Sequence, residues 1–104
     1  MDILQIYRGD TLRLTVTLTD SGGQPFVPAE GQQVVFSVGW PGEVLVAVPV
    51  TEGAASLTHQ DTARLLPAEY CFDVRVYNAD KTLVATPIFG KFVVKEAVND
   101  ALQL

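Results

Sequence analysis

Apolar and polar residues alternate along most of this chain with a period of two. The clearest runs cover residues 12–18, where leucine and valine alternate with arginine and threonine, and residues 68–78, where Tyr70 and Phe72 begin the apolar side. A period of two is typical of a β-strand that buries one face and exposes the other. The pattern therefore predicts a chain built mainly from strands.

Turn residues divide this pattern into short segments. Glycine, proline, asparagine and aspartate favour tight turns, and they interrupt the alternation at residues 20–23, 41–42, 53 and 78–81. The segments predicted as strands are residues 4–6, 12–18, 33–40, 44–48, 54–58, 68–78 and a strand pair within 82–95 that Pro87 interrupts. One helical turn is expected near residues 60–66, capped by Asp61 and stopped by Pro67.

About seven short strands at regular spacing predict an all-β fold, an immunoglobulin-like antiparallel β-sandwich. Its core is expected between two apolar faces, formed by Leu12, Leu14, Val16 and Leu18 on one side and by Phe36, Val38, Tyr70, Phe72, Val74, Phe92 and Val94 on the other. The 104 residues fit one domain. We expect the sandwich over residues 1–95 and a C-terminal tail over residues 96–104.

The charge balance restricts the partners. The formal net charge is −5, whereas nucleic-acid binding needs a basic surface, so neither nucleic acid nor an anionic membrane is expected. Residues 1–10 lack the long apolar run of a signal peptide, and no stretch approaches the roughly 20 apolar residues of a membrane span. The sequence predicts a protein made in the cytoplasm without a signal peptide.

Few residues are candidates for chemistry. His59 is the only histidine and Cys71 the only cysteine, so neither a disulfide within the chain nor a cysteine-type zinc site is expected. Catalysis by either residue needs a positioned partner that the sequence does not indicate. The acidic residues are scattered rather than spaced like a calcium loop. We expect no catalytic site, no cofactor and no metal.

The tripeptide Arg8-Gly9-Asp10 has the composition of a cell-adhesion ligand. It lies between two predicted strands, where glycine relieves a bend and aspartate accepts hydrogen bonds from nearby backbone. We therefore interpret it as a strand-entry corner.

Tyr70 follows a tight corner at Leu66-Pro67 and begins a late strand. This position matches the tyrosine corner of immunoglobulin-like and fibronectin-like sandwiches, in which the phenol bonds to backbone a few residues upstream. Tyr70 is therefore predicted to be structural. The remaining aromatic candidates for a sugar-stacking platform are Tyr7, Trp40 and Tyr77, with Trp40 and Tyr77 favoured.

The segment from Glu43 to Val50 is apolar on both faces. Valines occupy one side, and Leu45 and Ala47 occupy the other. Pro49 favours an edge strand, because proline cannot donate to a neighbouring strand, and an apolar edge promotes association. Either residues 24–32 cover this edge or a partner does. The candidate interface residues are Val44, Leu45, Val46, Ala47 and Val48.

Several motifs together carry a family resemblance: "GDT" followed by "LRLTVTLTD", a "GQP" turn, "VVFSV", "DTARLLPAEYCFDVRV" and a closing "GKFVV". From about Ile6 to Val94 the chain resembles the immunoglobulin-like domains of tail and baseplate proteins of phages and prophages, in particular the N-terminal domains of upper baseplate proteins. The resemblance implies a non-enzymatic building block that binds other virion proteins, made in the bacterial cytoplasm and carried as a virion component. The apolar edge of residues 44–48 makes the chain a candidate homo-oligomer as well. The alternatives are a carbohydrate-binding sandwich that grips the cell envelope and a small enzyme.

Overall fold

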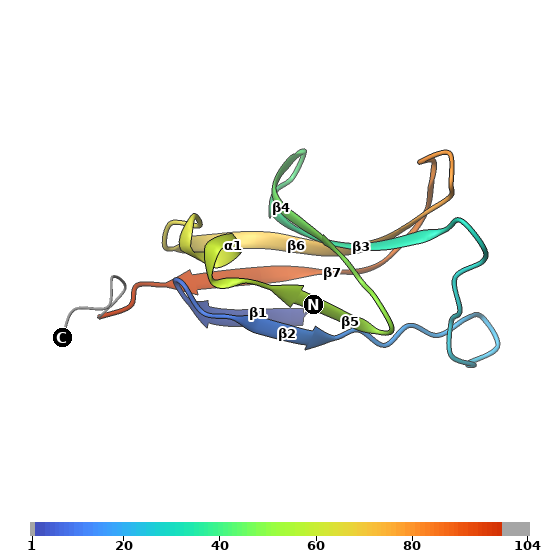
Figure 1. Cartoon of the computed structure of the whole chain (residues 1–104), viewed down its shortest axis with the longest axis horizontal. Helices are drawn as coiled ribbons and strands as arrows, with labels where there is room; N and C mark the ends of the chain where they lie inside the picture. Colours follow the sequence, from blue (N-terminus) through green and yellow to red (C-terminus); the bar gives the residue numbers. More distant parts are fainter. Residues whose placement is uncertain (1, 99–104) are drawn as a thin grey trace.

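The computed structural model describes residues 2–98, which form two β-sheets and one short helix (Figure 1). The elements in chain order are β1 Asp2–Tyr7, β2 Leu12–Thr15, β3 Gln33–Trp40, β4 Glu43–Pro49, β5 Ala54–Leu57, α1 His59–Ala63, β6 Ala68–Tyr77 and β7 Leu83–Lys95. A five-stranded sheet in the order β1-β7-β6-β3-β4 faces a two-stranded sheet of β2 and β5. The predicted all-β sandwich is therefore confirmed. The expected tail falls mostly on residues 99–104, outside the described residues.

The core lies between the two sheets. The residues of the larger sheet that were expected to be buried all have little exposed surface, namely Phe36, Val38, Tyr70, Phe72, Val74, Phe92 and Val94. From the smaller sheet and the segment after it, Leu12, Leu14, Val16 and Leu18 pack against them while partly exposed. In the two-stranded sheet Ala55 and Leu57 of β5 are completely buried, whereas the apolar residues of β2 are only partly covered. The alternating pattern identified both faces of the core correctly.

The strand β2 ends earlier than its sequence pattern suggests. Regular pairing with β5 stops at Thr15, although the alternation continues to Leu18. Beyond β2, the Val16 amide donates to the Gly53 carbonyl at 2.8 Å, and Leu18 accepts from the Phe26 amide at 2.9 Å. The later half of the predicted strand therefore runs along loops rather than along a neighbouring strand.

One strand pairing departs from the expected antiparallel arrangement, and the last strand is longer than expected. β1 runs parallel to β7, whereas the remaining strand pairs are antiparallel. β1 can pair in this direction because no hairpin joins it to β7, and almost the whole chain separates the two strands. β7 is also one strand rather than the predicted pair. Pro87 lies in an irregular stretch where Val74 pairs with Ile88 but Val76 pairs with Ala85, which accommodates a residue that cannot donate.

The helix α1 begins and ends earlier than predicted. Its N-cap is Thr58, whose hydroxyl accepts from the Asp61 amide at 3.2 Å, and the Asp61 carboxylate accepts from the Thr58 amide at 2.8 Å. This reciprocal pair is a capping box. Asp61 therefore stabilises the helix from its third position and is not the cap itself.

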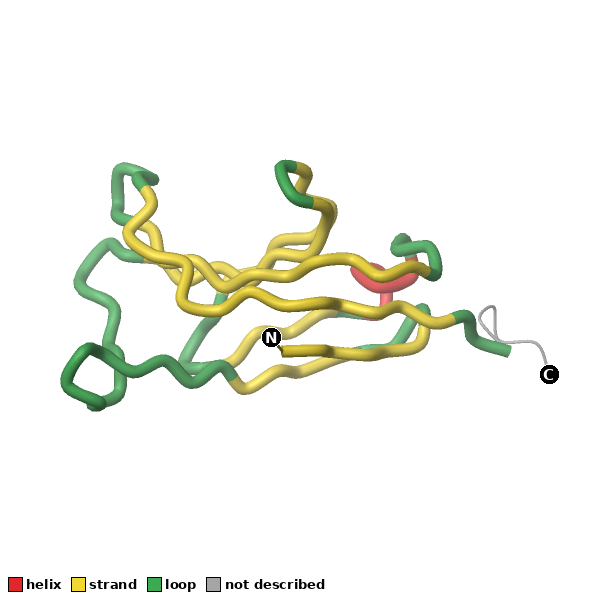
Figure 2. Tube along the Cα trace, turned by 180° about the vertical axis from the view of Figure 1, so that it is seen from behind, coloured by secondary structure: helices red, strands yellow, loops and turns green. Residues whose placement is uncertain are grey.

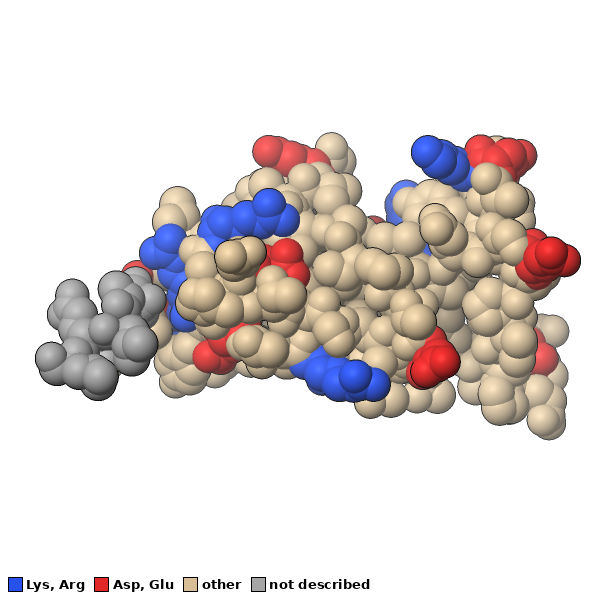
Figure 3. Space-filling model, in the orientation of Figure 1, with Lys and Arg blue, Asp and Glu red and all other residues tan. Residues whose placement is uncertain are grey.

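Both long hairpins bend away from the two-stranded sheet. Figures 1 and 2 show the β3–β4 and β6–β7 tips rising on the outer side of the five-stranded sheet. In the space-filling view the two tips stand on either side of a notch (Figure 3). The outer face between them is consequently hollow.

Candidate functional site

The outer face of the five-stranded sheet carries the polar half of β6. Residues of β6 alternate between buried and half-buried, so Cys71, Asp73 and Arg75 point away from the core. Asp73 pairs with Ser37 on β3 and with Phe89 on β7. Because directly paired residues share a face, these side chains meet on the outer surface.

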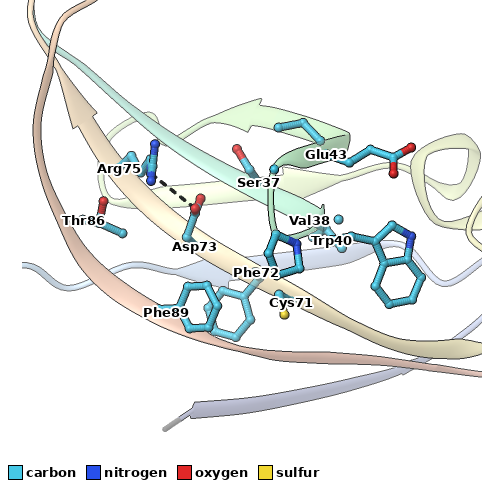
Figure 4. A pocket seen from close by; sticks show the side chains of 14 residues that line it. Ser37, Val38, Trp40, Glu43, Cys71, Phe72, Asp73, Arg75, Thr86 and Phe89 are labelled. Carbon is cyan, nitrogen blue, oxygen red and sulfur yellow. Dashed lines mark ion pairs between the residues drawn. The ribbon is translucent and has the colours of Figure 1, made fainter.

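A hollow of about 400 Å³ lies over this row of residues (Figure 4). Ser37 and Asp73 lie near its centre, Trp40 and Phe89 lie on different sides of them, and Arg75 lies beyond Asp73. We call this site the outer hollow, and its lining includes Ser37, Trp40, Val44, Asp73, Arg75 and Phe89. Its volume falls in the lower part of the range of about 300–1,000 Å³ typical of small-molecule sites.

Asp73 and Arg75 form an ion pair within the outer hollow, with 3.3 Å between the Arg75 Nε and the Asp73 Oδ2 (Figure 4). The contact between Arg75 Nε and Asp73 Oδ2 is an ion pair without hydrogen-bond geometry, and the enclosed Asp73 Oδ1 also has no hydrogen-bond partner within the described residues. Burial raises the pKa of the Asp73 carboxyl, and the positive charge of Arg75 offsets part of that rise. Asp73 Oδ1 and Arg75 Nε both have almost no solvent-accessible surface, so a molecule in the hollow would not reach them while the two side chains keep this arrangement.

Trp40 lies at the rim of the outer hollow, where the β3–β4 hairpin bends, and its side chain points away from Ser37 and Asp73 (Figure 4). Its ring packs on Tyr70 with 4.7 Å between centroids, yet 43% of the residue remains exposed. The bend is made at Gly39, where strand register shifts and where a Cβ atom would collide with the Glu43 carbonyl. A glycine is therefore required at the position that directs Trp40 and its hairpin.

The register shift changes which residues of β4 face outward. β4 lies at the sheet edge, as Pro49 predicts. Val44 pairs with Gly39 and is 65% exposed, whereas Leu45 is half-buried and packs against the core. Strict alternation places Val44 on the same face as Val46 and Leu45 on the other face with Ala47. The structure differs because alternation takes no account of a bulge.

The candidate interface on β4 is accordingly smaller than predicted. Val46 is 2% exposed and belongs to the core, and Val48 packs against the core while partly exposed. Val44 and Ala47 are the exposed members. Residues 24–32, which were considered as a cover for this edge, do not lie along it. Their Phe26 borders a hollow with Val34 and Val50, near the end of β4.

Tyr70 has tyrosine-corner geometry. Its hydroxyl donates to the Leu66 carbonyl at 2.5 Å, and the residue is almost completely buried. Burial raises the pKa of its phenol, an effect that the charge of Arg8 partly offsets. This arrangement fixes the crossover into β6 and uses the hydroxyl structurally.

The Arg8-Gly9-Asp10 tripeptide forms the corner between the two sheets. Gly9 has a φ of 90°, the Arg8 Nε donates to the Ala63 carbonyl at 2.8 Å, and the Asp10 carboxylate accepts from the Tyr7 amide at 2.9 Å. His59 joins the same corner, where its Nδ1 donates to the Gly9 carbonyl at 2.6 Å. Both charged side chains of the tripeptide therefore bond to backbone.

The other sequence candidates are dispersed. Cys71 is a free, half-buried thiol on the outer hollow. Of the aromatic candidates Tyr7, Trp40 and Tyr77, Trp40 belongs to the lining of the hollow. Phe89 was missed, although the alternation around Ile88 and Phe92 places it on the outer face.

Residues 2–98 contain neither a cluster of metal ligands nor a helix that could cross a membrane. No three histidine, cysteine, aspartate or glutamate side chains there are grouped to hold a metal ion. Over the same residues, no helix has the length and apolar character needed to cross a membrane.

Comparison with solved structures supports the fold. Neither a protein-family model nor a curated protein sequence matches this chain. The structure is similar to that of the fibronectin(III)-like modules of CbhA from Clostridium thermocellum, with a TM-score of 0.52 and 16% sequence identity over 93% of each chain. At this identity the likeness establishes a fibronectin(III)-like sandwich and not a shared activity.

Proposed function

We propose that this chain is a non-catalytic structural and interaction module that binds other virion proteins, or itself, in the tail or baseplate of a phage or prophage particle. The observation that carries the interaction role is the β4 edge. Val44 and Ala47 are exposed residues of β4, the edge strand of the five-stranded sheet. Unpaired backbone groups on such an edge form a template for another chain.

The amino-acid composition supports the same role. Hydrophobic residues make up 48% of the chain and charged residues 18%, whereas charged residues typically make up about 25%. Figure 3 shows broad areas without charge on the visible face. A partner that covers part of this surface would explain the excess of apolar residues.

The proposed setting in a virion rests on the sequence motifs that resemble phage tail and baseplate domains. The test is to induce particles from a strain that encodes the chain, purify tails on a density gradient and detect the protein by mass spectrometry. We expect a fixed ratio of this protein to the major tail protein across gradient fractions. Tails that contain none of it, although the cells express it, would contradict the proposed setting.

A further inference from the structure

We infer that the β4 edge of one copy pairs antiparallel with the β1 edge of a second copy, so that the five-stranded sheets of neighbouring copies become continuous. β1 and β4 are the two edge strands of this sheet (Figure 1). The inference rests on the self-association part of the proposed function, and it names the surface that the β4 edge contacts.

The backbone groups that β1 directs outward belong to Ile3 and Gln5. The Tyr7 amide donates to the Asp10 carboxylate at 2.9 Å, and the Tyr7 carbonyl accepts from the Asp10 amide at 3.0 Å, so the backbone groups of Tyr7 point away from β7. Backbone groups alternate in direction along a strand, and those of Ile3 and Gln5 therefore point the same way as those of Tyr7. Among the described strands β1 pairs with β7 alone, which leaves these groups open to another chain.

On β4 the outward backbone groups include those of Ala47 and Pro49. The Val50 amide, just after β4, donates to the Val34 carbonyl of β3 at 2.8 Å. By the same alternation, Ala47 and Pro49 direct their backbone groups away from β3. Pro49 offers only its carbonyl, because proline has no N–H. Before Ala47 the register shift near Gly39 interrupts the regular pairing, so the usable part of this edge is short.

The two short edges match in one antiparallel register. With Ala47 opposite Gln5 of the second copy, these residues exchange both backbone hydrogen bonds, and the Ile3 amide of the second copy donates to the Pro49 carbonyl. The missing N–H of Pro49 and the occupied groups of Tyr7 then fall at the ends of the ladder. Pairing of two β4 edges through Ala47 would instead place Pro49 opposite the irregular stretch of the other β4 strand.

The parallel direction fits less well. In that direction the Ala47 amide would donate to the Ile3 carbonyl of the second copy and the Ala47 carbonyl would accept from the Gln5 amide. Pro49 would then face the Gln5 carbonyl without an N–H to donate. The antiparallel direction therefore uses the outward groups of both edges more completely.

The antiparallel register also continues the apolar inner face of the sheet. It places Val46 opposite Ile6 of the second copy and Val48 opposite Leu4 of the second copy. Val46 and Ile6 are buried in the core, and Val48 and Leu4 pack against it while partly exposed. Because directly opposite residues share a face, the core-facing layer of one copy would run on into that of the next.

Such a contact is heterologous, since each copy uses one edge to bind and keeps the other edge free. Heterologous contacts produce closed rings or open filaments. This kind of assembly suits a structural module that occurs in several copies.

Two complementary variants test the inference by light scattering after gel filtration. Gln5→Pro removes the outward N–H of β1 and keeps the β4 edge, and proline is tolerated on an edge strand where the N–H faces solvent. Ala47→Glu disables the β4 edge and keeps β1. Each variant alone should be a monomer, whereas their equimolar mixture should form a dimer of twice the 11.3 kDa chain mass. Gln5→Ala keeps the N–H and should associate like the wild type.

A second measurement needs no variant and serves if Gln5→Pro does not fold. Amide hydrogen exchange of the wild-type protein should slow at Ile3, Gln5 and Ala47 as protein concentration rises from about one to hundreds of micromolar, because these amides donate across the contact.

The inference is overturned if Gln5→Pro associates like the wild type, if the mixture stays monomeric while the wild type associates, or if concentration protects Ala47 but not Gln5. Any of these results would leave the interaction role of the β4 edge in place with a different partner surface. A wild type that stays monomeric would overturn this inference and self-association together, and it would leave only the binding of other virion proteins.

Discussion

The Tyr70 hydroxyl donates a 2.5 Å hydrogen bond to the carbonyl of Leu66, four residues earlier in the chain. The bond ties the start of β6 to the end of the corner that precedes it. The same tyrosine ring packs against Trp40, so one residue stabilises both the crossover into β6 and the base of the β3–β4 hairpin.

Tyr70→Phe should remove this bond while keeping the ring. We expect the free energy of unfolding to fall by about 1 kcal/mol, measured by urea denaturation. Tyr7→Phe is the matched control, because Tyr7 is exposed on the edge strand β1, and it should change stability little. Equal effects of the two substitutions would show that the corner bond contributes nothing specific.

Phe72→Ala should unfold the domain or nearly so. Phe72 is buried and stacks on Phe36 with 5.5 Å between ring centroids, and truncation of a buried phenylalanine costs about 3–5 kcal/mol. The control is Phe89→Ala, which removes the same ring from the exposed face. A melting temperature of Phe72→Ala within a few degrees of the wild type would contradict the buried position of that ring.

The parts of the fold that were predictable are those governed by local alternation. The inner face of β6 and the role of Tyr70 follow from a period of two and from one corner. The orientation of Val44 and Leu45 did not follow, because a bulge opposite Gly39 reverses the alternation. The outer hollow was also missed, since it depends on how two hairpins bend in space. The parallel pairing of β1 with β7 was missed as well, because it brings together strands from opposite ends of the sequence that no local pattern relates.

Arg8-Gly9-Asp10 should not act as an adhesion motif. The Arg8 guanidinium and the Asp10 carboxylate are both hydrogen-bonded to backbone at the corner. Immobilised wild-type protein and Asp10→Glu should therefore show the same background binding to purified integrins. Specific, cation-dependent binding of the wild type that Asp10→Glu abolishes would refute this interpretation.

The stability of the fold should depend on Asp73 in a defined direction. Burial raises its pKa above the ordinary value of 3.8, so the folded state holds this proton to higher pH than the unfolded state does. The contribution of Asp73 to stability is therefore full below pH 3.8 and declines as pH rises through the folded-state pKa. Urea denaturation of the wild type and Asp73→Asn across this range should show the wild type losing stability relative to the variant.

Asp80→Asn is the control of opposite sign. Hydrogen bonds from Thr82 lower the pKa of Asp80, so the wild type should gain stability relative to this variant as pH rises towards 3.8. The same trend for both substitutions would contradict the environment assigned to Asp73.

The most direct test of the central claim is light scattering after gel filtration, at tens of micromolar protein. If the β4 edge mediates self-association, the wild type should show at least twice the chain mass of 11.3 kDa. Ala47→Glu should return it to a monomer, while Ser56→Glu, which adds the same charge to an exposed position of the other sheet, should not. A wild type that elutes as an 11.3 kDa monomer, or an oligomer that Ala47→Glu leaves intact, would contradict self-association through this edge.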